Sequence, residues 1–150
     1  MTTSVGIIVG SKSDLKIAEK AAERLGQLGI GYEITVCSAH RSPEKVREYA
    51  KGAESQGLKV IIAGAGLSAA LPGVVASYTT LPVIGLPIAA GSLGGVDSLY
   101  SIVQMPRGVP VATVGINNPE NAAILAAQIL ALSDKTVKEN LVDFRTTIAQ

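Results

Sequence analysis

The sequence is poor in cysteine, histidine and charged residues. Its 150 residues include one cysteine, Cys37, and one histidine, His40. One cysteine cannot close an intramolecular disulfide, and one cysteine with one histidine supplies too few soft ligands for a typical zinc site. We therefore expect a cytoplasmic protein that holds no structural metal.

Charge and hydrophobicity exclude further classes of protein. Charged residues make up 17% of the chain and hydrophobic residues 47%, which excludes a disordered or self-repelling chain. The formal net charge of +1 gives no field that would attract nucleic acid. The start of the chain does not match a signal peptide, and no apolar run reaches about 18 residues. We expect no contact with nucleic acid or membrane.

Short strand-like runs alternate with helical patterns along the whole chain. This order is typical of βαβ units and predicts one α/β domain over residues 1–150, a three-layer α/β/α sandwich. Right-handed crossovers would wind its strands into an open parallel sheet of the flavodoxin type, with strand order 2-1-3-4-5. The predicted strands are 5–9, 32–37, 60–63, 82–86 and 111–114, with helices over 14–28, 42–57, 96–103, 119–132 and 133–148 and another that begins near 71.

Polar side chains follow the first two predicted strands. In open parallel sheets ligands bind beyond the carboxyl ends of the strands, so these segments are candidates for a site. Residues 10–14, with Ser11 and Ser13, offer hydroxyls and helix-start amides to an anion, or they are a plain helix cap. After the second strand, His40 and Arg41 combine a proton-transfer group with a phosphate- or carboxylate-binding group, unless His40 is an inert surface side chain.

A glycine-rich segment follows the third predicted strand. Residues 64–69, GAGLSA, match the G-x-G-x-x-A pattern of dinucleotide-binding proteins, but the acidic residue expected about 20 residues further on is absent. We therefore interpret Gly64, Ala65 and Gly66 as a place where a planar ligand and its carboxylate approach backbone amides closely. Cys37, at the end of the second strand, is interpreted as a packed small side chain rather than a nucleophile. No Walker A, G-x-S-x-G or H-E-x-x-H sequence is present.

Five segments together resemble one known family. They are GSKSD at 10–14, SAHRSP at 38–43, AGAG at 63–66, LPG at 71–73 and GVDSLYSIVQMPRGVPVAT at 95–113. In this order, over essentially the whole chain, they are similar to the PurE family, the N5-carboxyaminoimidazole ribonucleotide mutases of purine biosynthesis. The resemblance implies an isomerase that moves a carboxylate from the exocyclic nitrogen to C4 of an aminoimidazole ring, without metal, biotin or ATP.

The resemblance also implies roles for the candidate residues. His40 would be the general acid and base, Arg41 would bind the phosphate, and Asp14 would help to hold the ribose phosphate. The other substrate-binding positions that the resemblance implies are Ser11, Ser13, Ser38, Ala39, Gly64, Ala65, Gly66 and Leu71. One departure stands out, because Ala70 occupies the place where the family commonly has a second histidine.

Alternatives to the mutase share much of the same site. They are a carboxylase that uses carbon dioxide directly on aminoimidazole ribonucleotide, a carboxylase for another nucleotide, and a non-catalytic nucleotide-binding module. The segment 85–108 looks like that of a mutase and favours the mutase.

The resemblance implies an assembly as well. Family members are typically octamers, so we expect a homo-oligomer, and an octamer in particular. The last predicted helix has an amphipathic stripe that we expect to dock on a neighbouring copy, unless it packs on its own domain. The stripe consists of Val137, Leu141, Phe144 and Ile148.

Overall fold

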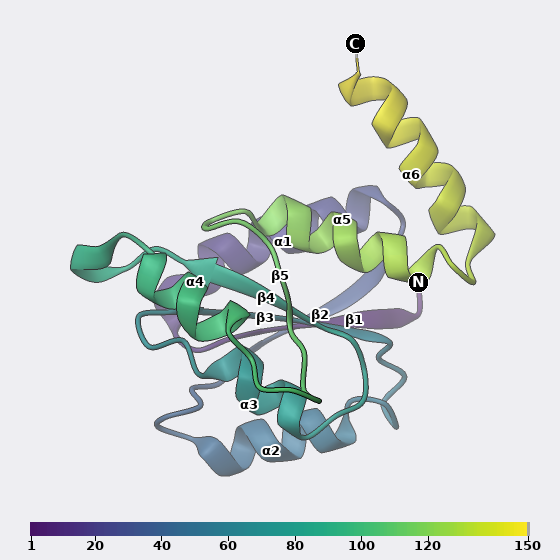
Figure 1. The fold of residues 1–150 in the computed structure, drawn as a ribbon. Coiled ribbons are helices and arrows are strands. Elements are labelled where there is room, and N and C mark those ends of the chain that lie inside the picture. Colours follow the sequence, from purple (N-terminus) through teal and green to yellow (C-terminus); the bar gives the residue numbers. More distant parts are fainter. Residues whose placement is uncertain (150) are drawn as a thin grey trace.

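A parallel sheet forms the centre of the molecule, with helices on both of its faces (Figure 1). The computed structural model describes residues 1–149. Over these residues the sheet has the order β2-β1-β3-β4-β5, which confirms the predicted order. Its strands are β1 (Thr3–Val9), β2 (Gly31–Val36), β3 (Val60–Gly66), β4 (Val83–Ile88) and β5 (Ala112–Thr113).

In the described part of the chain, α1 (Leu15–Gln27) and α5 (Pro119–Leu130) cover one face of the sheet, and α6 (Lys135–Ile148) packs on these two helices. The other face carries α2 (Pro43–Gly52), α3 (Leu71–Ser77) and α4 (Val96–Val103). Two 3-10 turns, η1 (Lys12–Asp14) and η2 (Gly91–Leu93), follow β1 and β4. Among residues 1–149 no helix has the length and apolar character needed to cross a membrane.

The central strands are buried because both of their faces are apolar. In β1 the side chains of Val5, Ile7 and Val9 join the core under α1 and α5, and Ile8 joins the core above α2 and α3. All four are fully buried. The edge strand β2 differs, since Tyr32 is 39% exposed. Apolar central strands are what a parallel sheet between two helical layers requires.

Helices α1 and α5 contact each other, and most of their buried side chains are alanines. Because an alanine side chain is a single methyl group, two helices that meet through alanines can approach closely. The buried alanines of these two helices are Ala18, Ala21, Ala22, Ala122, Ala123, Ala126 and Ala127.

The last helix packs on its own chain, which corrects the prediction that its apolar stripe docks on a neighbour. Val137 and Leu141 are buried in the same apolar cluster as residues of α1 and α5, and Phe144 packs against this cluster. Ile148 is 61% exposed, at the end of α6 that projects from the body (Figure 1). The first three residues of the stripe therefore stabilise the domain itself.

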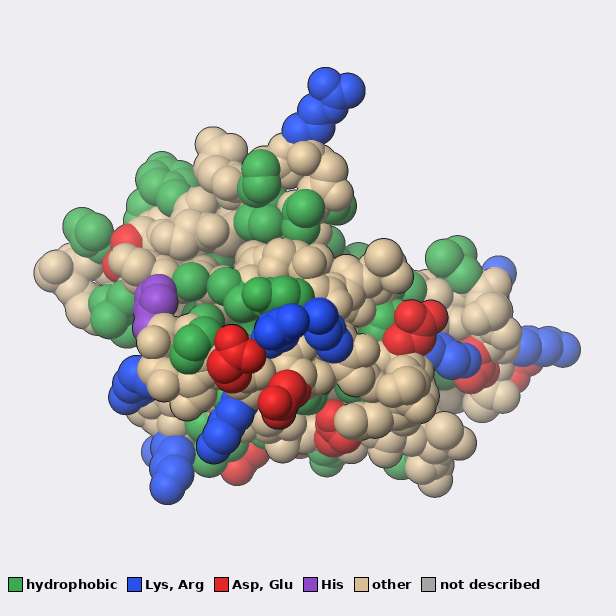
Figure 2. All heavy atoms as spheres, turned by 90° about the horizontal axis from the view of Figure 1, so that it is seen from below, with side chains coloured by type: hydrophobic (Ala, Val, Ile, Leu, Met, Phe, Trp, Pro, Cys, Tyr) green, Lys and Arg blue, Asp and Glu red, His purple; other side chains and the backbone are tan. Residues whose placement is uncertain are grey.

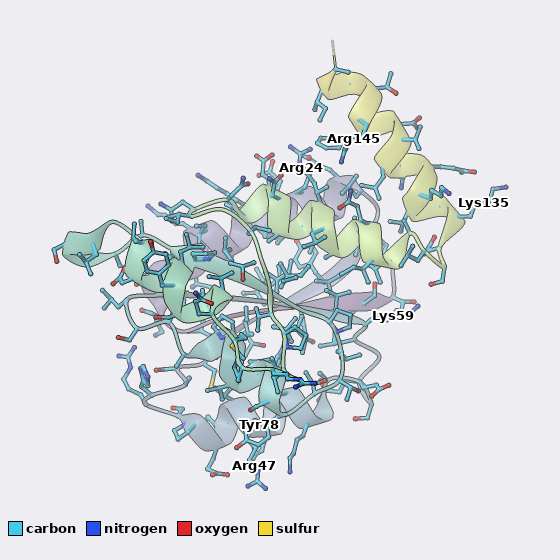
Figure 3. The ribbon with its side chains drawn as sticks, viewed as in Figure 1. Arg24, Arg47, Lys59, Tyr78, Lys135 and Arg145 are labelled. Atoms are coloured by element: carbon cyan, nitrogen blue, oxygen red, sulfur yellow. The ribbon has the colours of Figure 1, made fainter. Side chains whose placement is uncertain are left out.

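Arg24 of α1 joins the helices on this face (Figure 3). Its guanidinium carbon lies 4.7 Å from the centre of the Phe144 ring of α6, and its Nη2 donates to the Glu120 carboxylate of α5 at 3.0 Å. The Asn140 side chain of α6 also donates to the Leu28 carbonyl at the end of α1, at 3.0 Å. These contacts explain why α6 lies against its own chain.

Helix α2 ends earlier than predicted. Regular helix stops at Gly52, five residues before the predicted end at Gly57. The Ser55 hydroxyl donates to the Gly52 carbonyl at 2.8 Å, and serine bonds of this kind compete with helical hydrogen bonds. Turns then continue to Gly57, which has a φ of +93°, and the Leu58 amide donates back to the Ala53 carbonyl at 3.1 Å. Glycine closes the turns here rather than the helix.

Strand β3 is longer than predicted. We expected it to end at residue 63, but its pairing with β4 continues to Gly66, which lies opposite Ile88. The glycine-rich segment therefore begins as strand and not as a turn. At the other end of the sheet β5 is shorter than the predicted 111–114, and Pro110, which has no amide hydrogen, precedes it.

Candidate functional site

Three strand ends lie side by side at one edge of the sheet. Val9 pairs with both Val36 and Gly64, so β1, β2 and β3 reach this edge together. The connections that follow them form a cavity of about 640 Å³. Its lining consists of Gly10, Ser11, Ser13, Asp14, Ser38, Ala39, His40, Arg41, Ala65, Gly66, Leu67, Ser68, Ala69, Ala70, Leu71 and Ala90. Predicted site residues from three separate segments of the sequence thus share one cavity.

A larger groove, of about 850 Å³, lies between α5 and α6. Its lining includes the apolar side chains of Leu132, Leu141 and Val142, and it contains none of the predicted site residues. We locate the candidate site in the smaller cavity because the hydroxyl, imidazole, guanidinium and carboxylate groups converge there.

The turn after β1 presents two hydroxyls to the cavity. Ser11 Oγ accepts a hydrogen bond from the Ser13 amide at 3.3 Å and lies 2.9 Å from Ser13 Oγ. The Asp14 amide donates to the Ser11 carbonyl at 3.0 Å, and α1 begins at the next residue. Hydroxyls grouped at the start of a helix suit an oxyanion such as a phosphate.

Ser38 orders the loop after β2, which carries His40 and Arg41. Its Oγ accepts from the Arg41 amide at 3.2 Å and from Arg41 Nε at 3.4 Å. The guanidinium is therefore oriented before any ligand binds. His40 lines the cavity and is exposed, and it is the purple side chain at the surface in Figure 2, because the chain has one histidine. An imidazole in this position can exchange protons with both a ligand and solvent.

The third wall of the cavity comes from the end of β3 and the start of α3. Ala65, Gly66 and Leu71 line it, but Gly64 does not. Gly64 is buried within the sheet, where an added Cβ would lie 3.3 Å from the side chains of Val9 and Ile88. The prediction that Gly64 lines the pocket is therefore wrong, because Gly64 is paired with β1 on one side and β4 on the other.

The cavity is also lined by residues outside the predicted set, which are Gly10, Leu67, Ser68, Ala69, Ala70 and Ala90. Leu67 has a φ of +56° and is 55% exposed, and Ala90 follows β4. Asn117 fixes the loop that holds Ala90, since its Oδ1 accepts from the Ala89 amide at 2.9 Å and its amide donates to the Pro87 carbonyl at 2.8 Å. Asn117 also has a left-handed backbone, with a φ of +54°. This conformation is common enough for asparagine to be considered from the sequence, but it is rare for leucine.

Burial affects the acidity of Asp14 at the cavity wall. Desolvation raises the pKa of its carboxyl group above the usual 3.8, and a backbone hydrogen bond at Ser11 lowers it by less. The net direction is upward, so the fold favours the protonated form. The stabilisation that comes from protonated Asp14 is thus fully present below its usual pKa, and it is lost as the pH rises through the raised pKa of the folded protein.

Asp14→Asn is expected to raise the melting temperature at pH 7 slightly, by about 1 °C, because the carboxylate is only half buried. The difference from wild type should shrink as the pH falls toward 4, where Asp14 takes up a proton. Thermal unfolding of both proteins between pH 7 and pH 4 measures this. A difference that stays constant over that range would contradict the assignment of burial as the cause.

The cavity has no cluster of metal ligands. Within residues 1–149 no group of three or more His, Cys, Asp or Glu residues is placed to hold a metal ion. Cys37 precedes the cavity residue Ser38 and is buried, with its Sγ 3.8 Å from the Ser42 carbonyl. Its burial is consistent with the interpretation as a packed side chain.

Known proteins that are similar to this chain include a mutase, a carboxylase and a solved structure. The chain is 57% identical over 141 residues to the N5-carboxyaminoimidazole ribonucleotide mutase of Thermotoga maritima, covering 94% of this chain and 82% of that protein. It is 61% identical over 127 residues to the phosphoribosylaminoimidazole carboxylase of Schizosaccharomyces pombe, covering 85% of this chain but 23% of that protein. The crystal structure of Treponema denticola PurE superposes with a TM-score of 0.91 at 38% identity, covering 99% of this chain and 92% of that one.

Fold and cavity together define an α/β protein of the flavodoxin type with a polar ligand site at the carboxyl edge of its sheet. The family profile described as AIR carboxylase matches residues 4–150. The chain belongs to this family.

Proposed function

We propose that this protein is an N5-carboxyaminoimidazole ribonucleotide mutase. It would move the carboxylate from the exocyclic nitrogen to C4 of the imidazole ring, a step of purine biosynthesis. The observation that carries the proposal is the cavity itself, where the 10–14, 38–41 and 65–71 segments meet. The support from relatives is that mutases of several organisms are 55–59% identical to the chain.

The polar groups divide into a ribose phosphate end and a base end. Ser11, Ser13 and Arg41 bind the phosphate, because hydroxyls and an oriented guanidinium suit its oxygens. Asp14 accepts hydrogen bonds from the ribose hydroxyls. The base then lies along Ala65, Gly66 and Leu71, where small and apolar residues leave room for a flat ring.

The reaction needs one proton-transfer group. Breaking the bond between nitrogen and carboxylate releases carbon dioxide, and the nitrogen takes up a proton from His40. The electron-rich C4 attacks the carbon dioxide while the cavity confines it, which raises its local concentration. C4 then carries both hydrogen and carboxylate, and His40 accepts the proton so that the ring becomes aromatic again. One proton moves from C4 to nitrogen, and His40 returns to its starting form.

Direct carboxylation is the second candidate function. It is supported by the identity of 61% to a fungal protein named phosphoribosylaminoimidazole carboxylase. Ala70 lines the cavity and leaves space that a larger side chain would fill. The two functions differ in the source of the carboxylate, which is the carbamate substrate in a mutase and dissolved carbon dioxide in a carboxylase.

Purified protein is expected to turn over the carbamate substrate at least about tenfold faster than aminoimidazole ribonucleotide with bicarbonate, because only the carbamate delivers its carbon dioxide inside the cavity. Formation of 4-carboxy-5-aminoimidazole ribonucleotide under matched conditions measures both rates. Equal rates would favour the carboxylase. Binding of both nucleotides without turnover would favour a non-catalytic module.

We also propose that the protein is a cytoplasmic homo-oligomer, with an octamer as the expected assembly. The support is an apolar surface on α4, where Val96, Tyr100 and Val103 recur at helical spacing and Tyr100 is 63% exposed. Leu93, in the 3-10 turn that precedes α4, is also exposed, at 64%. A second copy of the chain is the proposed partner of the α4 surface.

Light scattering at micromolar protein is expected to give a mass near eight times 15.3 kDa, about 122 kDa. Tyr100→Glu should lower the mass because it places a charge in the α4 surface. Val142→Glu is the matched control, since Val142 is 58% exposed but lies on α6. A wild-type mass near 15.3 kDa would refute the assembly, and dissociation by Val142→Glu alone would move the interface to the α5–α6 groove.

A further inference from the structure

Ser98 of α4 is a buried hydroxyl in an otherwise apolar core. Its side chain has no exposed surface, and it is the one buried residue of polar type in the part of the chain that the structure describes. The Ser98 Oγ donates to the Ala65 carbonyl at 2.6 Å and accepts from the Ile88 amide at 3.3 Å. One hydroxyl thus joins the ends of β3 and β4 to α4.

The strand register gives this hydroxyl a defined place in the sheet. Backbone groups of successive residues in a strand face alternate neighbouring strands. The Ile61 amide donates to the Pro82 carbonyl on the β4 side at 3.0 Å, so Ala65, four residues later, also faces β4. The register between β3 and β4 places the Ile88 amide opposite the Ala65 carbonyl. Ser98 therefore bridges two groups that the sheet brings opposite each other.

Holding the Ala65 carbonyl also fixes the next amide. A trans peptide is planar, so the Gly66 N–H points away from the Ala65 carbonyl and toward the β1 side of β3. The last pair between β1 and β3 is Val9 with Gly64, so Gly66 lies beyond the shared ladder. Gly66 lines the cavity, as does Ser11 from the β1 side. Its amide is a donor that faces the candidate site.

We propose that Ser98 is a positioning residue for this site. Its hydroxyl holds the Ala65–Gly66 peptide so that the Gly66 amide donates a hydrogen bond to the carboxylate on the imidazole ring. The identity of that ligand rests on the proposed function. An amide that donates to a carboxylate makes a charge-assisted hydrogen bond, so its direction matters for binding.

The surroundings of Gly66 support a fixed peptide. An added Cβ on Gly66 would lie 3.2 Å from both the Ala90 Cβ and the Ile88 carbonyl oxygen, so this segment already contacts the end of β4. Ser98 itself is not among the residues that line the cavity. It acts on a ligand only through the backbone of Gly66.

The test compares two ligands in Ser98→Ala by calorimetric titration. Affinity for 4-carboxy-5-aminoimidazole ribonucleotide is expected to fall about tenfold or more, because one charge-assisted hydrogen bond is misdirected, while affinity for ribose 5-phosphate stays within about twofold. Ser101→Ala is the matched control. Ser101 lies on the same helix, is exposed, and donates only to the Asp97 carbonyl of its own helix, at 2.8 Å.

The outcomes separate this proposal from the proposed function. Equal losses for both ligands in Ser98→Ala, or no loss for either, overturn the positioning role. Ser98→Cys keeps the side-chain volume with a weak donor, and it gives the same comparison if Ser98→Ala does not fold. Wild-type protein that binds the carboxylated nucleotide but turns over neither substrate overturns the function and leaves the ligand comparison intact. Wild-type protein that binds neither ligand overturns both.

Discussion

His40→Asn is expected to lower turnover of the carbamate substrate by about 100-fold or more while nucleotide affinity stays within a few-fold. Asparagine keeps a polar side chain of similar size but cannot exchange a proton at neutral pH. His40 is the chain's one histidine and lines the cavity, so the described site offers no second imidazole for the transfer. Steady-state rates and titration with the product measure the two effects separately.

Arg41→Ala is the contrasting variant in the same loop. Its guanidinium is assigned to the phosphate, a contact that is the same in the ground state and the transition state, so its loss should raise KM more than it lowers kcat. Near-normal turnover in His40→Asn would remove His40 from the reaction. A fall in kcat alone for Arg41→Ala would remove the phosphate assignment.

Gly95→Ala is expected to destabilise the protein by about 3 kcal/mol or more. Gly95 precedes α4 with a φ of +93°, a conformation that side chains disfavour. An added Cβ would lie 2.6 Å from an Ile116 methyl and 3.1 Å from the Ala89 Cα. The backbone of Ala89 cannot move away without disturbing the loop that follows β4.

Gly94→Ala is the matched control for this prediction. Gly94 is also left-handed, with a φ of +60°, but an added Cβ meets nothing within 4 Å. It should cost only the conformational penalty, about 1 kcal/mol. Urea unfolding of both variants at one protein concentration compares the free energies of unfolding. Equal losses would mean that the loop relaxes around the new methyl group.

The strand order of the sheet could be predicted because its central strands are recognisable in the sequence. Residues 5–9 and 60–63 are continuous apolar runs, and helical patterns separate them, which limits the possible strand orders. The extension of β3 to Gly66 could not be predicted, because it depends on pairing with β4. The end of α2 differs from the prediction for a local reason, since both Gly52 and Gly57 can end a helix and the Ser55 hydroxyl bonds to the Gly52 carbonyl.

The candidate site was predictable where chemistry and strand ends coincide. Ser11, His40 and Arg41 each follow a recognisable strand, and the rule for parallel sheets brings such segments together. Leu67 also follows a strand, but its left-handed backbone had no indication in the sequence, and neither did the role of Ser98. Leucine is rarely left-handed, and a serine within an apolar helix acquires its partners only when α4 meets the sheet.

The buried alanines of α1 and α5 determine how this part of the fold responds to substitution. Alanine has no side-chain rotamers, so the contact between these helices forms at almost no cost in side-chain entropy. For the same reason it has no alternative rotamers with which to absorb a larger neighbour. A substitution such as Ala122→Leu, at a fully buried position, therefore requires the backbone to move. Because α6 rests on α1 and α5, its position would shift with them.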